Sequence, residues 1–459
     1  MKRTSYLLLL TLAIAAGLCS CQKAFLEDKP DKALLVPRTL SDLRALLDNI
    51  NVFNRSPGLT LIADGDFFTT DAGYRTYELA QEQNSYTWAA DIYGNEPGFE
   101  WNDGYKQILY ANVVLEGLQG QAQGAADPAE QAAVEGTALF SRAWANYGLV
   151  QMYCPVYQAA SAAADPGIPN RIHADVTERV PRGNLAENYR QITGDLLRSR
   201  QLLPLQTAFK SRPARSAVYA LLARVYLSMG DFDRAGRYAD SVLQISPALI
   251  DYNTLTATAT RPFPRGLPNG NPEILYYSAS LSYTFSGSSA IAYCDSVLYR
   301  SYAANDLRKV MFFRDGGGGK VNFKGSYTGA IALFSGLTTD EAYLIRAESA
   351  ARAGNPAAAL QDLNTLLSRR WKTGTYQPLT AAGTTDVLGL VLSERRKELV
   401  GRNIRWADLK RLNTESRLAV TLKRKIGGAD YTLAPGSRRY VYPLPPEELR
   451  LGGLEQNVR

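Results

Sequence analysis

The side chains best suited to acid–base or nucleophilic chemistry are scarce in this chain. Its one histidine, His173, lies in the proline-flanked stretch PNRIHADV, which holds no serine or cysteine of a nucleophile motif. A general base must reach the proton it removes, so we interpret His173 as a solvated loop residue. Two of the 44 acidic residues could meet from anywhere as a glycosidase pair, although no pair stands out. We therefore expect a binding protein and not an enzyme.

Two cysteines follow an apolar run in MKRTSYLLLLTLAIAAGLCSC. Lys2 and Arg3 precede this run as in a secretory signal peptide, and the run is too short to span a membrane. LCSC resembles the bacterial lipobox, whose leucine stands three residues before an acylated cysteine. We expect residues 1–20 to be removed and Cys21 to carry lipid, which anchors a protein stably when more than one chain is attached. A plain secretory signal with an incidental cysteine pair is the alternative.

The remaining cysteines, Cys154 and Cys294, lie far apart and match no metal-ligand spacing. We expect two small buried residues, with a disulfide as the alternative in an exported protein. The shortage of histidine and cysteine argues against zinc, whereas calcium bound by loop oxygens stays open. No cofactor is expected.

Aromatic side chains offer a binding surface of another kind. The chain has 27 tyrosines, and residues 64–99 concentrate aromatic rings among Asp, Asn, Gly and Thr. Such rings can stack on a ligand while the polar groups bind hydroxyls or amides. We expect ligand contacts from Trp88 and Tyr74, with Asp66 as a polar contact and Tyr283 as a further candidate. The alternative is that the rings anchor a long loop to the scaffold.

Helices must position this segment. Helical spacing predicts helices over residues 40–49, 101–119, 128–153 and 182–203, whereas residues 51–99 show no dominant period. The formal net charge of +7 is spread over segments of mixed sign, so nucleic-acid binding is not expected.

Two segments follow the tetratricopeptide pattern of paired helices. In the first, Leu222, Ala223, Tyr226, Gly230, Ala235 and Pro247 stand in register, and in the second Ala347, Gly354 and Ala359 repeat the offsets. An insert rich in Pro, Gly, Ser, Thr and Tyr separates the two units over about residues 251–337, so we expect a loop-rich lobe there and not a simple solenoid. Its Gly316–Gly319 run lacks the spacing of a phosphate-binding loop and predicts a surface loop.

These segments together resemble the SusD/RagB family of outer-membrane nutrient-binding lipoproteins of Bacteroidetes. The resemblance is carried by the following stretches: CQKAFLEDKPD, WNDGYKQILYANVVLEGL, SRAWANYGLVQMYCPVY, SERRKELVGRNIRWADLKRLN and YPLPPEELRLGGLEQN. The chain departs from the common family pattern at Arg402 and Asn403, where Glu and Gly are usual. We expect the ion-pair arrangement to be rebuilt locally. We interpret Glu394, Arg395, Glu398, Arg405 and Asp408 as a structural network that closes the helical core, with ligand binding as the alternative.

The resemblance implies a mainly α fold: a SusD-like domain over residues 21–459 in which a tetratricopeptide-like helix-turn-helix scaffold carries the inserted loop-rich lobe. It places the tetratricopeptide-like segments at about 130–153, 214–247 and 340–371. It also implies a lipid-anchored protein of the outer membrane, on the cell surface, that delivers a glycan to a SusC-like TonB-dependent transporter. A peptide-binding RagB-type companion and a helical scaffold for a protein partner are the alternatives.

Overall fold

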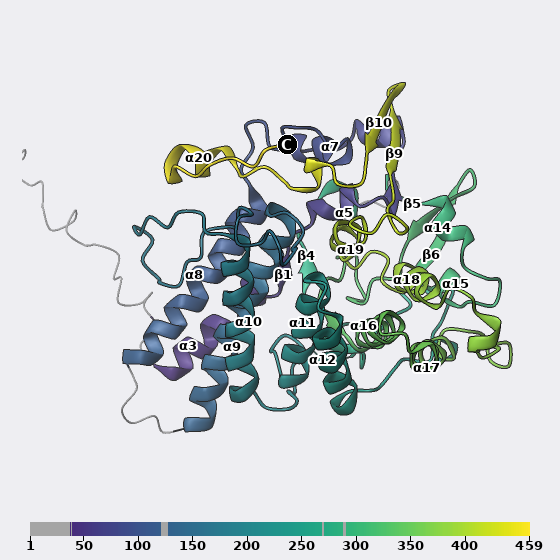
Figure 1. Cartoon of the computed structure of the whole chain (residues 1–459), viewed down its shortest axis with the longest axis horizontal. Helices are drawn as coiled ribbons and strands as arrows, with labels where there is room; N and C mark the ends of the chain where they lie inside the picture. The colour runs from purple at the N-terminus through teal and green to yellow at the C-terminus, as the bar shows by residue number, and fades with distance from the viewer. Residues whose placement is uncertain (1–36, 38, 121–126, 269, 288–290) are drawn as a thin grey trace, which may run out of the picture.

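The computed structural model describes residues 37, 39–120, 127–268, 270–287 and 291–459 (Figure 1). The expected signal peptide and Cys21 lie outside these residues. Across the described part of the chain, no helix combines the length and the apolar character that crossing a membrane requires.

Long helices form one end of the molecule. They are α3 (Leu40–Leu47), α8 (Phe99–Gly120), α9 (Pro128–Tyr153) and α10 (Leu185–Leu202), of which α9 packs against both α8 and α10 (Figure 1). The Asp127 carboxylate accepts the amides of Ala129 and Glu130, which fixes the start of α9 where the sequence predicts it. The predicted start of α10 was three residues early, because Asn184 caps that helix through the amide of Glu187.

The two tetratricopeptide-like units are confirmed as helix pairs. The first comprises α11 (Arg215–Ser228) and α12 (Phe232–Ile245), and the second α16 (Thr339–Arg352) and α17 (Pro356–Leu367). Gly230 and Gly354 make the two turns with φ of +73° and +74°, a region that favours glycine. Although the lobe separates the units in sequence, α12 packs against α16. The units are therefore neighbours in space, and the lobe is an insertion between two helix pairs that stack on each other.

The segment without a dominant period folds into short elements. These are α4 (Ile50–Phe53), β1 (Arg55–Ser56), α5 (Leu59–Ala63), β2 (Phe67–Phe68), α6 (Asp71–Tyr74) and α7 (Ala80–Tyr86).

The lobe is built from short helices and paired strands, as expected. Its elements are η2 (Tyr252–Thr254), β3 (Ile274–Tyr276), β4 (Ala279–Ser280), α13 (Thr284–Gly287), β5 (Tyr293–Cys294), α14 (Ser296–Arg300), α15 (Arg308–Phe312), β6 (Phe313–Gly317), β7 (Lys320–Phe323) and β8 (Leu337–Thr338). Strand β1 pairs in parallel with β4, and β2 pairs antiparallel with β5. These two strand pairs join the lobe to residues 51–99. Gly316 and Gly317 end β6, and the exposed Gly318 and Gly319 form the turn of the β6–β7 hairpin.

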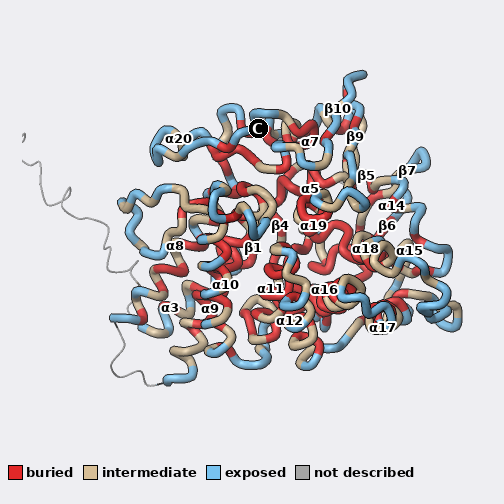
Figure 2. Tube along the Cα trace, viewed as in Figure 1, coloured by how far each residue is buried: buried red, intermediate tan, exposed pale blue. Residues whose placement is uncertain are grey.

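The C-terminal part closes the molecule. It contains η3 (Ala381–Gly383), α18 (Val387–Glu398), α19 (Arg405–Leu412), the hairpin β9 (Leu422–Ile426) and β10 (Ala429–Leu433), η4 (Arg438–Tyr440) and α20 (Pro446–Gly452). Figure 2 shows buried chain running through the middle of the fold, along α9, α11, α16 and α5. Cys154 and Cys294 are buried there as free thiols, as the sequence predicts.

Candidate functional site

Trp88 lies in the core and not on the surface. Its side chain is 2% exposed, and its Nε1 donates to the carbonyl oxygen of Ala63 at 3.0 Å. One ring face is covered by the Arg424 guanidinium, 4.6 Å from the ring centre. Stacking on a ligand requires a free face, and Trp88 offers none in this structure. Its position matches the alternative role of an anchor for the loop.

Tyr74 is half-buried and keeps part of its ring at the surface. Its hydroxyl donates to the carbonyl oxygen of Gln83 at 3.3 Å, and its ring packs on Tyr77 and Tyr86 at centroid distances of 5.8 and 5.9 Å. Burial raises the pKa of Tyr74, so the hydroxyl stays protonated and can donate a hydrogen bond.

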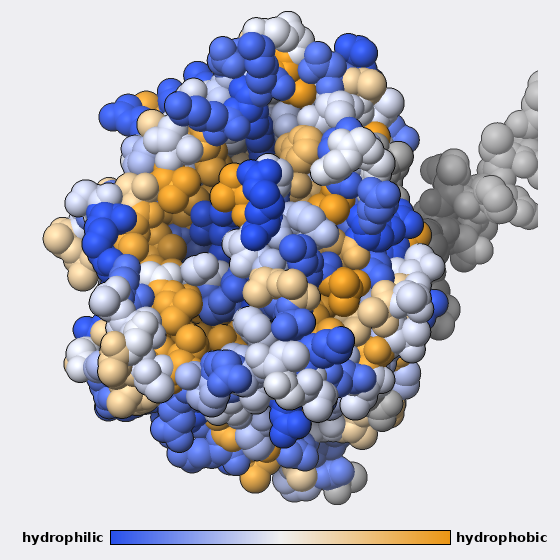
Figure 3. All heavy atoms as spheres, turned by 90° about the vertical axis from the view of Figure 1, so that its right-hand side faces the viewer, coloured by the Kyte–Doolittle hydropathy of each residue, from blue (hydrophilic) through white to orange (hydrophobic). Residues whose placement is uncertain are grey.

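Two further half-buried rings lie on elements linked to α6. Phe68 precedes α6 on β2, and Tyr431 on β10 lies close enough to raise the pKa of Tyr74. Asp71 of α6 accepts the amide of Gly427, which ties the β9–β10 hairpin to α6. We call Phe68, Tyr74 and Tyr431 the aromatic edge. Figure 3 views the side of the molecule that carries β5, β6 and the β9–β10 hairpin; apolar side chains form separate patches there, and the surface is hollowed between two of them.

Asp66 is buried and ion-paired. It is 1% exposed, and its Oδ1 lies 2.8 Å from Arg396 Nε and 3.9 Å from Arg405 Nε. Its backbone oxygen also accepts the amide of Asp295 at 2.8 Å. The Asp66 carboxylate therefore joins α18 and α19 to the loop segment, with its charge already balanced.

Tyr283 is also buried, and its hydroxyl donates to Glu100 Oε1 at 2.6 Å. The same oxygen accepts the amides of Gly58 and Leu59, whereas Glu100 Oε2 has no partner among the described residues. Burial raises the pKa of Glu100 despite these bonds. Of the four expected contact residues, Trp88 shares Arg424 with Tyr86, whose ring packs on Tyr74, whereas Asp66 and Tyr283 have other partners in the core.

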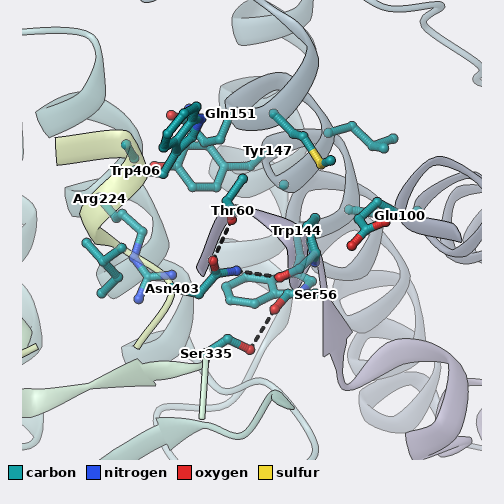
Figure 4. A pocket seen from close by; sticks show the side chains of 18 of the residues that line it. Ser56, Thr60, Glu100, Trp144, Tyr147, Gln151, Arg224, Ser335, Asn403 and Trp406 are labelled. Carbon is teal, nitrogen blue, oxygen red and sulfur yellow. Dashed lines mark hydrogen bonds between the residues drawn. The ribbon is translucent and has the colours of Figure 1, made fainter. Parts of the chain in front are cut away.

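An interior cavity lies where α5, α8, α9, α11 and α19 meet (Figure 4). Asn403 spans it, accepting from the Thr60 hydroxyl at 2.6 Å and donating to the carbonyl oxygen of Pro57. Its φ of +58° explains why glycine is the usual residue here and why asparagine is tolerated. The centre of a water molecule can reach only ≈ 80 Å³ of this space. The cavity therefore suits water and not a sugar ring.

An open groove runs between α8, residues 169–180 and α20. The centre of a water molecule can reach ≈ 650 Å³ of this groove. Half-buried Tyr105 and Tyr110 line it, and the Tyr105 hydroxyl donates to the carbonyl oxygen of Pro169 at 3.0 Å. His173 lies on its rim with a 57% exposed side chain, 3.7 Å from Glu116, as expected for a loop residue. The sequence did not reveal this groove, because α20 reaches it from the far end of the chain.

Three buried carboxylates lie close enough together to suggest a metal site. Oxygens of Glu273, Asp340 and Glu398 lie within 4.8 Å of one another. Arg370 contacts Glu273 and Glu398 at 2.9 and 2.8 Å, and Arg402 contacts Asp340 at 3.0 Å. Guanidinium groups thus already occupy the positions a cation would need, and we interpret the cluster as structural.

The ion-pair network expected from the sequence is present in part. Of the five expected residues, Arg395 and Asp408 pair with each other at 2.9 Å, Glu394 and Glu398 pair with Arg308 at 2.6 and 3.1 Å, and Arg405 lies 3.9 Å from Asp66. Arg402, a departure from the family pattern, enters the network through Asp340. The substitution is therefore compensated within the core.

Comparison with known protein families gives matches at both ends of the chain. The family model described as "Starch-binding associating with outer membrane" matches residues 24–227, and that described as "SusD family" matches residues 340–458. "SusD-like protein P2" of Formosa agariphila is 25% identical over 99% of this chain and 98% of its own.

Solved structures share the fold over almost the whole chain. A "putative sugar binding protein" from Bacteroides vulgatus superposes with a TM-score of 0.74 at 21% identity, covering 92% of this chain and 99% of that one. "Surface glycan-binding protein A" from Bacteroides fluxus gives a TM-score of 0.68 at 16% identity, covering 91% and 98%.

Proposed function

Because this chain belongs to the SusD/RagB family, we propose that it is a lipid-anchored protein of the cell surface that binds a glycan and delivers it to a SusC-like TonB-dependent transporter. The description of the N-terminal family model, which associates its members with the outer membrane, supports the location. Two structural neighbours whose names refer to sugar or glycan binding support the ligand class.

The observation that carries the binding site is the aromatic edge. Phe68 on β2, Tyr74 on α6 and Tyr431 on β10 are partly exposed rings, and Tyr431 lies close to Tyr74. Aromatic faces pack on the apolar faces of sugar rings, and exposed Asp71 and Arg75 beside them can bind hydroxyl groups. Tyr74 remains the central contact. Trp88, Asp66 and Tyr283 are buried, and direct contact by any of them would require the segment to open.

Binding without catalysis fits the available side chains. The only histidine is exposed on a loop beside Glu116, and both described cysteines are buried with raised pKa values, that of Cys154 to about 12 because of burial. A thiol in that state is a poor nucleophile.

Family membership supports the transporter partner, and this part of the proposal has a direct test. We propose that the helical end docks on the barrel while the lobe covers its opening. Gentle detergent extraction with crosslinking should recover one large barrel protein with this chain. Recovery of a soluble protein partner would favour the scaffold alternative, and binding of peptides but not glycans on an array would favour the RagB-type alternative.

A further inference from the structure

Three basic side chains converge on the lobe, next to the β6–β7 hairpin. Lys324 follows β7, and its Nζ donates to the carbonyl oxygens of Ala257 and Ala259 at 2.6 and 3.2 Å. Arg261 closes the same threonine-rich turn and donates to the carbonyl oxygen of Lys324 at 3.4 Å. Arg314 lies on β6, two residues after Phe312, whose carbonyl oxygen accepts the amide of Lys324 at 2.7 Å.

Neither Arg261 nor Lys324 has a carboxylate within ion-pair distance among the residues the structure describes. Both groups are partly or largely buried, and desolvation followed by the charge of Arg314 lowers the pKa of each. Buried cations in folded proteins are normally paired with an acid, as Arg308 and Arg370 are in this core. Arg261 and Lys324 therefore hold positive charge that no described acid neutralises at ion-pair distance.

The acidic residues of the lobe have partners other than Arg261 and Lys324. Glu273 and Asp306 form buried ion pairs with Arg370 and Arg308. The other three lobe acids also have partners: Asp251 lies 3.6 Å from Arg369, Asp295 lies 3.4 Å from Arg396, and Asp315 accepts the amide of Gly317. None of these described lobe acids is paired with Arg261 or Lys324, which leaves both cations open to an anion from a ligand.

We propose that Arg261, Arg314 and Lys324 form an oxyanion subsite that binds the sulfate ester or carboxylate of an acidic glycan. Guanidinium groups suit such oxyanions because their donors form paired, charge-assisted hydrogen bonds. Exposed hydroxyls of Thr256, Thr258 and Thr260 in the adjoining turn add neutral donors. This inference rests on the proposed glycan-binding function and gives its ligand a charge.

The subsite adjoins the elements that carry the aromatic edge. Asn322, the register partner of Arg314 on β7, donates from Nδ2 to the carbonyl oxygen of Ala292, next to β5. The Tyr293 ring on β5 packs on Phe68 of the aromatic edge at a centroid distance of 5.6 Å. One oligosaccharide chain crossing β5 could therefore meet the aromatic edge and the basic cluster together.

The test measures binding of the full chain in detergent by calorimetry, using a sulfated galactan, its desulfated form, a polyuronate and its methyl ester. Arg261→Gln and Arg314→Gln should each weaken binding of a charged glycan by about tenfold or more and leave its neutral form unaffected. Arg300→Gln is the control, since it removes an exposed charge of the same lobe on α14.

If the two variants weaken binding of the sulfated galactan alone, the subsite binds a sulfate ester. If they weaken binding of the polyuronate as well, the subsite binds oxyanions in general. Equal binding of charged and neutral forms, or equal effects of Arg261→Gln and Arg300→Gln, would overturn the subsite while leaving glycan binding intact. Failure of the wild-type chain to bind any neutral or charged glycan would overturn the proposed function as well.

Discussion

The guanidinium carbon of Arg424 lies 4.6 Å from the centre of the Trp88 ring and 3.9 Å from that of Tyr86. Arg424 belongs to β9, yet it donates to the carbonyl oxygens of Ile62 and Tyr86 in the segment before α8. The C-terminal hairpin therefore holds the segment before α8 in place. Trp88 adopts φ +52° in this segment, a left-handed conformation that a bulky residue accepts only when its surroundings hold it.

This packing makes Trp88 a stability residue. Trp88→Ala should lower the free energy of unfolding by about 3–5 kcal/mol, the usual cost of removing a buried large aromatic side chain. Urea unfolding followed by circular dichroism measures the change. Phe99→Ala is the matched control, because Phe99 is 40% exposed and its loss should cost under about 0.5 kcal/mol. Equal stability of the two variants would contradict the buried position.

Glu100 should make stability depend on pH. Burial raises its pKa in the folded state above the ordinary value of 4.5, so folding binds a proton and stability falls as pH rises through and above that value. Glu100→Gln keeps the shape and removes the titration. The variant should gain stability relative to wild type as pH increases from about 4 to 8. A constant difference between the two proteins across that range would argue against the raised pKa.

The lipid anchor is testable at the N-terminus. Mass spectrometry of membrane-extracted protein should show an acylated Cys21 as the first residue, and Cys21→Ser should release the protein or leave it unprocessed. An intact, unmodified peptide spanning Cys21 in wild-type membranes would contradict the lipoprotein assignment.

Local signals explain what the sequence could predict. Helix α9 begins at Pro128 behind the Asp127 cap, and the tetratricopeptide turns fall on Gly230 and Gly354, because caps and left-handed turns depend on neighbouring residues alone. The pair of Arg395 and Asp408 was foreseeable because both residues stand in one stretch of α18 and α19, whereas Arg308 and Arg370, the partners of Glu394 and Glu398, come from distant segments.

The features that the sequence could not predict depend on contacts between distant segments. Nothing within residues 64–99 reveals that Arg424 will cover Trp88, or that Arg396 will neutralise Asp66. Surface and core rings carry the same residue letters, so Tyr74, the half-buried candidate, could not be separated from its buried neighbours. The aromatic edge also depends on Tyr431, which the segment gains only when the hairpin folds over α6.

The central claim is that the aromatic edge binds glycan, and calorimetry on full-length protein with an array-identified glycan tests it most directly. Tyr74→Ala and Tyr431→Ala should each weaken binding by about tenfold, by analogy with the ~1–3 kcal/mol of base stacking on aromatic rings. Tyr110→Ala, which removes a half-buried ring of the open groove beside α8, should leave the affinity unchanged. Unchanged affinity in the two edge variants, both folded by circular dichroism, together with weaker binding by Tyr110→Ala, would contradict the account and move the site to the groove.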